Sequence, residues 1–298
     1  MRGTFQDLMR LHRDAMRTPR DYLAGALAQS RLEKLAPHVD SAPPVVTLPG
    51  FGASARTHAR LVAYLNHCGY KAQTFEAGFP TEGTIIEFVR KLDATLGQLV
   101  RGLADAHGSA VALVGQSAGG LFSREFARLF PQEIDRVITL GAPTADPDKH
   151  HLNNRALELL IRRMAGAGGF EEQAGPDGLL HWPHSQPALP YVAICSPVDG
   201  AIHEETALVP ARTVARSSSR APRENIRVRC SHFGMSYNPL VILAVADRLG
   251  QRGDWWEDFE PRHYFPYLPQ RMLRRFFPDP SGGPGGEAET DKCVDKKF

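Results

Sequence analysis

The segment Val111-Ala-Leu-Val-Gly115-Gln116-Ser117-Ala118-Gly119-Gly120 decides the fold of this chain. The apolar run from 110 to 114 is typical of a strand that is buried on both faces. It ends at a glycine, turns at Ser117 and continues as a helical pattern. A strand, the sequence Gly-x-Ser-x-Gly and a helix together predict a sharp turn that lifts the serine hydroxyl above a sheet. The flanking glycines fit this prediction, because side chains there would collide in so tight a turn.

Length and composition predict an ordinary globular protein. The 298 residues are 42% hydrophobic and 23% charged, with a net charge of +2. This balance argues against a nucleic-acid-binding protein, which carries a concentrated basic surface. There is no signal-peptide pattern and no apolar run of 18 residues, so we expect a cytoplasmic protein without a transmembrane segment.

The four cysteines lack the close spacing of a zinc site. Cys195 and Cys230 fall in two predicted strands, and we expect both to be small buried thiols. A disulfide between them would need an oxidising compartment.

Strand and helix patterns alternate along the middle of the chain. Strands are expected near 43–48, 70–75, 110–114, 134–140, 190–195 and 225–230, and helices at 56–67, 84–106, 120–130 and 239–249. Right-handed crossovers between such strands produce a mainly parallel, doubly wound sheet with helices on both faces, which is an α/β fold. Residues 144–188 interrupt the alternation, and a connection of this length is expected to form a cap or lid.

The two ends of the chain lie outside this pattern, so the predicted α/β domain spans 43–260. Residues 1–42 predict a helical extension in two pieces, divided at Pro19 with Thr18 as the N-cap of the second. Its apolar residues are expected to pack on the outside of the domain; the alternative is a basic helix in peripheral contact with a membrane. Residues 261–298 predict an aromatic strap followed by a disordered tail.

Three residues that together can perform nucleophilic catalysis follow predicted strands. Ser117, Asp199 and His232 each stand at the carboxyl end of a strand, in the order serine, acid, histidine. Serine needs a base to take its proton, and the base needs an acceptor that orients it. Asp146 and Asp148 are weaker candidates for the acid, and His203 is too close to Asp199 to fit the order.

Such chemistry also needs backbone donors for the negatively charged oxygen that forms during attack. The N–H of Ala118, directly after the serine, is one candidate. Phe51, in the glycine-rich turn after the first strand, is the other. We expect no metal site, because the histidines of the predicted cap have no acidic partner on a common helix. These are His150, His151, His181 and His184.

Four ordered motifs carry a resemblance to the α/β-hydrolase superfamily, and within it to bacterial lipase/esterase-type serine hydrolases. They are Pro49-Gly50-Phe51, Gly115 to Gly120, Ser196-Pro-Val-Asp199-Gly200 and Ser231-His232-Phe-Gly-Met-Ser-Tyr-Asn238-Pro239. The resemblance covers roughly residues 43–260. It implies hydrolysis of a small-molecule ester or lipid by Ser117, Asp199 and His232, with no cofactor. Pro49 stands where lipases commonly have histidine.

Two other functions remain open at this point. An acyltransferase or thioesterase would use the same three residues and the same acyl-enzyme. The acyl group would then pass to an alcohol, amine or thiol. A non-catalytic binding protein could keep the fold alone, although such proteins usually lose one of the three residues. Serine at the turn argues against haloalkane dehalogenase and epoxide hydrolase chemistry, which use aspartate there. The sequence leaves the oligomeric state open.

Overall fold

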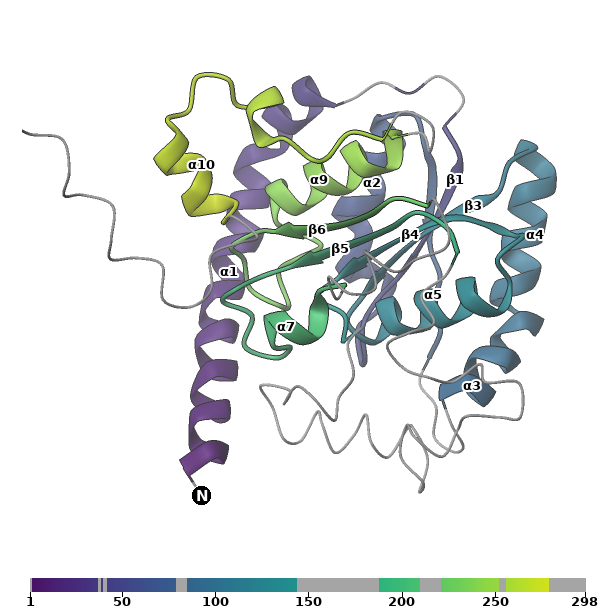
Figure 1. The fold of residues 1–298 in the computed structure, drawn as a ribbon, viewed down its shortest axis with the longest axis horizontal. Coiled ribbons are helices and arrows are strands. Elements are labelled where there is room, and N and C mark those ends of the chain that lie inside the picture. The colour runs from purple at the N-terminus through teal and green to yellow at the C-terminus, as the bar shows by residue number, and fades with distance from the viewer. Residues whose placement is uncertain are drawn as a thin grey trace, which may run out of the picture.

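A computed structural model describes residues 2–36, 39, 42–78, 85–143, 188–209, 221–251 and 256–278 (Figure 1). Nearly all of the predicted cap lies outside the described residues. The same holds for its candidate acids and histidines and for the tail after residue 278.

The described strands form one parallel sheet in the order β2-β1-β3-β4-β5-β6. They are β1 (Pro44–Leu48), β2 (Lys71–Thr74), β3 (Val111–Gln116), β4 (Ile134–Leu140), β5 (Tyr191–Cys195) and β6 (Arg223–Arg227). The order reverses between β1 and β3, and the carboxyl ends beside such a reversal are where α/β sheets bind ligands. The predicted α/β class with a parallel, doubly wound sheet is confirmed.

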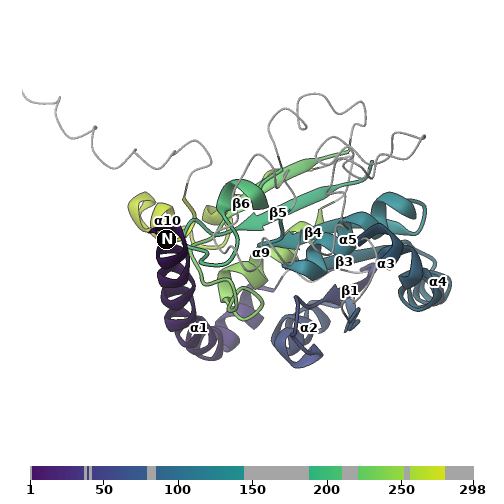
Figure 2. The same cartoon turned by 90° about the horizontal axis from the view of Figure 1, so that it is seen from below.

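Helices cover both faces of the sheet (Figure 2). One face packs against α1 (Arg2–Leu35), α2 (Ala59–His67) and α9 (Pro239–Gly250), and the other against α3 (Ile85–Lys91), α4 (Leu96–His107) and α5 (Ala118–Leu129). Shorter elements are η1 (Ala55–His58), η2 (Leu92–Ala94), α7 (Glu204–Ala207), η4 (Pro261–His263) and α10 (Gln270–Phe276).

The single helix predicted over 84–106 is wrong in detail, because α3, η2 and α4 divide it. Thr95 leaves the helical region, with φ −126° and ψ −67°. Its hydroxyl donates to the carbonyl of Leu92 at 3.3 Å. Threonine side chains compete for backbone groups in this way, and the chain starts a new helix at Leu96.

The predicted division of the N-terminal segment is also wrong, because α1 runs through Pro19 without ending. Thr18 is not an N-cap; its hydroxyl donates to the carbonyl of Asp14, one turn earlier, at 3.1 Å. A proline inside a helix costs about 3 kcal/mol. Contacts of α1 with the body on both sides of Pro19 offset that cost, since tertiary packing supplies most helix stability in proteins.

The face of α1 that packs differs from the one its apolar residues predict. Leu8, Met16, Leu23 and Leu27 are 59–74% exposed. The inner face instead buries Asp14, Asp21, Gly25 and Leu32. The segments beneath this face present backbone N–H groups, for which a carboxylate is a better partner than a hydrocarbon side chain.

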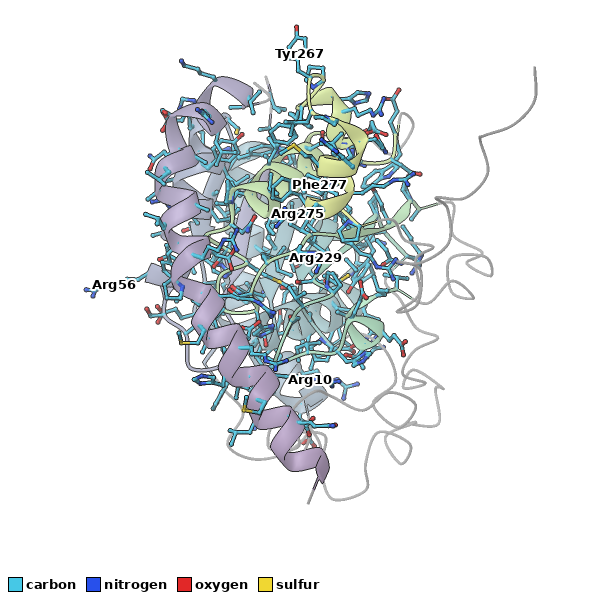
Figure 3. All side chains as sticks on the ribbon, turned by 90° about the vertical axis from the view of Figure 1, so that its left-hand side faces the viewer. Arg10, Arg56, Arg229, Tyr267, Arg275 and Phe277 are labelled. Carbon is cyan, nitrogen blue, oxygen red and sulfur yellow. The ribbon has the colours of Figure 1, made fainter. Side chains whose placement is uncertain are left out.

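Aromatic residues near the end of the described chain pack on the side of the sheet that carries α9. They are Trp256, Phe259, Tyr264, Phe265, Phe276 and Phe277. Tyr267 is an exception and projects from the surface, as Figure 3 shows. None of the described helices combines the length and the apolar character that crossing a membrane requires.

Candidate active site

Ser117 occupies a strained turn between β3 and α5. Its backbone angles are φ 52° and ψ −123°, and among the described residues no other non-glycine has a positive φ. An L-residue is held in such a conformation only where its surroundings enforce it, and such residues cluster at functional sites. The sharp turn that the sequence predicts at this serine is therefore present.

The glycines around the turn are required by close packing. A Cβ on Gly119 would lie 2.2 Å from the carbonyl oxygen of Leu48, and one on Gly115 would lie 2.4 Å from the oxygen of Gly119. A Cβ on Gly120 would lie 2.5 Å from that of Ala142. These separations are far inside van der Waals contact, so the steric reasoning from the sequence is confirmed.

Asp199 and His232 form a buried hydrogen-bonded pair. Oδ2 of Asp199 lies 2.8 Å from Nδ1 of His232. Oδ1 accepts the N–H groups of Ala201 and Ile202, both at 2.8 Å, which fixes the carboxylate beyond the end of β5. An ionised carboxylate can only accept hydrogen bonds, so Nδ1 carries a proton and Nε2 of neutral His232 is left as a base.

The surroundings of His232 act on its pKa in opposite directions. Burial lowers the pKa of the imidazole, because it disfavours the charged form. The charge of Asp199, the hydrogen bond to it and the charge of Asp14 raise it, and their sum prevails. The pKa of His232 is therefore above its ordinary value.

Gln116 joins the turn at Ser117 to the segment that carries His232. Its amide donates to the carbonyl of His232 at 2.7 Å, and its Oε1 lies 3.2 Å from Nε2 of His58. Burial lowers the pKa of His58 to about 4, so this imidazole is neutral at pH 7. Sequence reasoning missed both residues, although the first x of Gly-x-Ser-x-Gly marked the position of Gln116.

The glycine-rich turn after β1 lies against Ser117. The N–H of Ala53 donates to the carbonyl of Gly50 at 3.1 Å. A Cβ on Gly50 would lie 3.0 Å from that of Ser117. The turn therefore has no room for a larger residue beside the serine. The N–H groups of Phe51 and Ala118 remain the predicted donors to an oxyanion.

A residue of α1, Asp14, enters this site from the opposite end of the sequence. Its side chain is fully buried. Oδ1 accepts the N–H of Gly200 at 3.0 Å and the N–H of His232 at 2.9 Å. Asp14 thus holds the residue after Asp199 and the backbone of His232 at once.

Asp21 makes a similar contact two helical turns further along α1. Its Oδ2 accepts the N–H of Ser231 at 2.8 Å and the hydroxyl of the same residue at 2.5 Å. Its Oδ1 accepts the side-chain amide of Asn238 at 2.8 Å. Asn238 in turn caps α9 by accepting the N–H of Leu240. Sequence reasoning missed both carboxylates of α1.

Other candidates have ordinary structural surroundings. His203 accepts the N–H of Glu205 and caps α7. Cys195 and Cys230 are free and buried, as expected, and burial raises the pKa of both thiols. In the part of the chain that the structure describes, no cluster of three histidine, cysteine or acidic side chains could hold a metal ion.

Comparison with solved structures relates this architecture to known proteins. The thermophilic carboxylesterase EstE1, from a metagenomic library, is 16% identical with a TM-score of 0.51, covering 73% of this chain and 83% of that one. A structure from the work on the metagenome-derived lipolytic enzymes LipS and LipT is 14% identical with a TM-score of 0.49, covering 71% and 95%. The RedJ thioesterase of Streptomyces coelicolor is 15% identical with a TM-score of 0.45, covering 69% and 90%.

In sequence, no protein-family model and no curated protein matches the chain. The similarity to EstE1 therefore concerns the fold, and it agrees with the sheet order and the strained serine turn. The chain has the α/β-hydrolase fold.

Proposed function

We propose that this protein is a serine hydrolase that cleaves carboxylic esters. Ser117 is the nucleophile, His232 the general base and acid, and Asp199 the group that orients the imidazole. The observation that carries the proposal is the 2.8 Å hydrogen bond between Asp199 and His232. It is accompanied by a serine in a strained turn between strand and helix, and Gln116, directly before that serine, donates to the backbone carbonyl of His232.

In the proposed reaction, Oγ of Ser117 attacks the ester carbonyl while Nε2 of His232 takes its proton. The carbonyl oxygen becomes an oxyanion facing the N–H groups of Phe51 and Ala118. The alcohol leaves with the proton from His232, so an acyl-enzyme remains. Water then repeats the sequence, releases the carboxylic acid and restores Ser117.

The geometry of the described residues is compatible with this mechanism. Within the part of the chain described, the hydroxyl of Ser117 makes no hydrogen bond. Catalytic hydrogen bonds are often long before substrate binds. Gln116 ties the serine turn to the backbone of His232, so the two segments have a fixed relation. The raised pKa of His232 makes it a stronger base for the serine proton.

Covalent labelling tests the nucleophile directly. A fluorophosphonate probe is expected to label the wild-type chain at Ser117 and to leave Ser117→Ala unlabelled, because alanine has no hydroxyl to phosphonylate. Intact-protein and peptide mass spectrometry measure the adduct. Ser123, whose buried hydroxyl donates to the carbonyl of Gly119, offers a matched control: Ser123→Ala should still be labelled. Equal labelling of wild type and Ser117→Ala would exclude the proposal.

Turnover then identifies the substrate class. A series of p-nitrophenyl esters from acetate to palmitate separates short-chain esterase activity from lipase activity. Competing alcohols, amines and thiols divert the acyl group if the enzyme is an acyltransferase. Acid release that no acceptor diminishes supports hydrolysis.

The outer face of α1 supports a further proposal, peripheral contact with an anionic lipid surface. Leu23 and Leu27 are 59% and 74% exposed. Exposed arginines accompany this apolar face, while Asp14 and Asp21 are turned into the protein. A helix with exposed apolar and basic residues is attracted to anionic headgroups and buries its apolar side chains beneath them.

We expect the wild-type chain to sediment with phosphatidylglycerol-containing vesicles and to be released by salt. The double change Leu23→Glu and Leu27→Glu should weaken binding about tenfold or more, because both acids repel the surface. Its hydrolysis of a soluble short ester should match wild type. Failure of the wild type to bind such vesicles would refute the contact. A wild-type dimer that the variant disrupts would instead assign this face to a second copy.

A further inference from the structure

We propose that Asp14 is a positioning residue for catalysis, because its carboxylate joins the segment that carries Asp199 to the segment that carries His232. This inference rests on the proposed function. It assigns the inner face of α1 a role in the reaction, whereas the sequence suggested only an outer extension.

The contacts of Asp14 lie at the two places where the acid–base pair meets the backbone. Gly200 directly follows Asp199, and its N–H donates to Oδ1 of Asp14 at 3.0 Å. The N–H of His232 lies 2.9 Å from Oδ1 and 3.0 Å from Oδ2. One buried side chain therefore fixes the relative position of two segments that come from different strands.

Close packing shows how near α1 lies to these segments. A Cβ on Gly200 would lie 2.4 Å from the carbonyl oxygen of Arg10 and 2.6 Å from Cβ of Asp14. A Cβ on Gly234, two residues after His232, would lie 2.6 Å from Cβ of Asp21. Glycine at both positions lets the helix approach until its carboxylates reach the backbone N–H groups.

Gly25, on α1 itself, also permits a close contact, in this case with the backbone of the segment that follows His232. A Cβ there would lie 2.3 Å from the carbonyl oxygen of Tyr237. The ring of Tyr237 stacks on Tyr22 at a centroid separation of 3.8 Å. Helix α1 thus runs along the histidine-bearing segment toward α9. Glycines allow the close contact between them, and the carboxylates of α1 provide the hydrogen bonds.

Asp14 is also a charge beside the base. The groups that act on His232 are Asp199, through its charge and hydrogen bond, and Asp14, through its charge. Burial raises the pKa of Asp14, the bonds from His232 and Gly200 lower it, and the charge of Asp199 raises it further. While Asp14 is ionised, it stabilises the imidazolium that forms when Ser117 gives up its proton.

A structural role alone and a positioning role make different predictions. A structural residue stabilises the fold and leaves the titration of His232 unchanged. A positioning residue of this kind affects the rate of the chemical step and the pH at which the base loses activity. The experiment therefore needs a neutral isostere as well as a truncation.

Asp14→Asn keeps an oxygen that can accept both N–H groups and removes the charge. Without that charge the imidazolium is less stable, so the pKa of His232 falls. The acid limb of the kcat/KM profile should move to lower pH. Asp14→Ala removes both hydrogen bonds, and kcat should fall about 10²-fold with little change in KM, the size expected from misplaced catalytic groups.

Two variants of the same helix are matched controls. Asp21→Asn alters a buried carboxylate of the same helix whose hydrogen bonds go to Ser231 and Asn238 and not to His232. Its acid limb should coincide with that of wild type. Glu33→Gln removes an exposed charge of α1 and should leave both kcat and the pH profile unchanged.

The titration of His232 is measured independently by NMR of ring-labelled histidine, assigned with His232→Gln. A lower pKa in Asp14→Asn than in wild type supports the inference even if every ester proves inert, a result that would remove only the proposed function. An unchanged NMR titration in Asp14→Asn refutes the inference. So does an Asp14→Ala enzyme that folds and retains wild-type kcat.

Discussion

Replacing Asp199 with asparagine is expected to lower kcat about 10⁴-fold on any ester that the wild type turns over. In this structure Oδ1 of Asp199 accepts the N–H groups of Ala201 and Ile202. The oxygen of an asparagine would be held there by the same donors. Its NH₂ would then face Nδ1 of His232, which must accept, so the proton moves to Nε2 and the base is lost.

Steady-state kinetics with a p-nitrophenyl ester measure this loss, and thermal unfolding checks that the variant is folded. Glu205→Gln, an exposed acid in the same region, is the control and should keep wild-type kcat. A fall of less than about tenfold in Asp199→Asn would show that another acceptor orients His232. The proposed role of Asp199 would then be wrong.

Gly119→Ala should have the largest effect on stability. The new Cβ would lie 2.2 Å from the carbonyl oxygen of Leu48 and 2.4 Å from that of Pro49. Both are backbone atoms that move only if β1 and the glycine-rich turn move with them. We expect a loss of about 3 kcal/mol in the free energy of unfolding, and slower fluorophosphonate labelling of Ser117, because the turn against the serine is displaced.

Gly102→Ala adds the same methyl group at a position where it causes no steric clash. Gly102 lies inside α4, and a Cβ there would have no atom within 4 Å. Alanine should stabilise the helix by about 0.5–1 kcal/mol. Denaturant unfolding measures the change in the free energy of unfolding for both variants, which should be negative for Gly119→Ala and positive for Gly102→Ala. A Gly119→Ala protein as stable as Gly102→Ala would contradict the steric account of the turn.

Much of the fold could be predicted because its signals are local. Apolar or alternating runs predicted the strands, and Gly115, Gly119 and Gly120 marked a turn that tolerates no side chain. The partners in the hydrogen bond between Asp199 and His232 are the ones that their order along the chain predicts. Each of these inferences needed only a short window of sequence and the rule that parallel strands end at one edge.

The role of α1 could not be predicted in this way. The sequence predicted that the apolar residues of this helix pack on the domain. In the structure Leu23 and Leu27 face outward, while Asp14 and Asp21 face the protein. Hydrophobic periodicity assumes that a helix rests on apolar side chains. Here Leu32 packs on the core, but Asp14 and Asp21 of the same face bind backbone N–H groups, whose positions depend on loops far away in sequence. The spacing of Asp14, Asp21 and Gly25 on one helical face was the only local sign.

The long sequence separation of these contacts also has a consequence for biosynthesis. Asp14 binds residues 186 and 218 positions away. Helix α1 is synthesised before the sheet, and Asp14 gains its first partner, Gly200, only after β5 has been made, and its second, His232, only after β6. Closing so long a loop is entropically costly. The nascent chain therefore carries the serine turn well before it has a complete site, and the proposed ester hydrolysis must wait until the segment that carries His232 has been made.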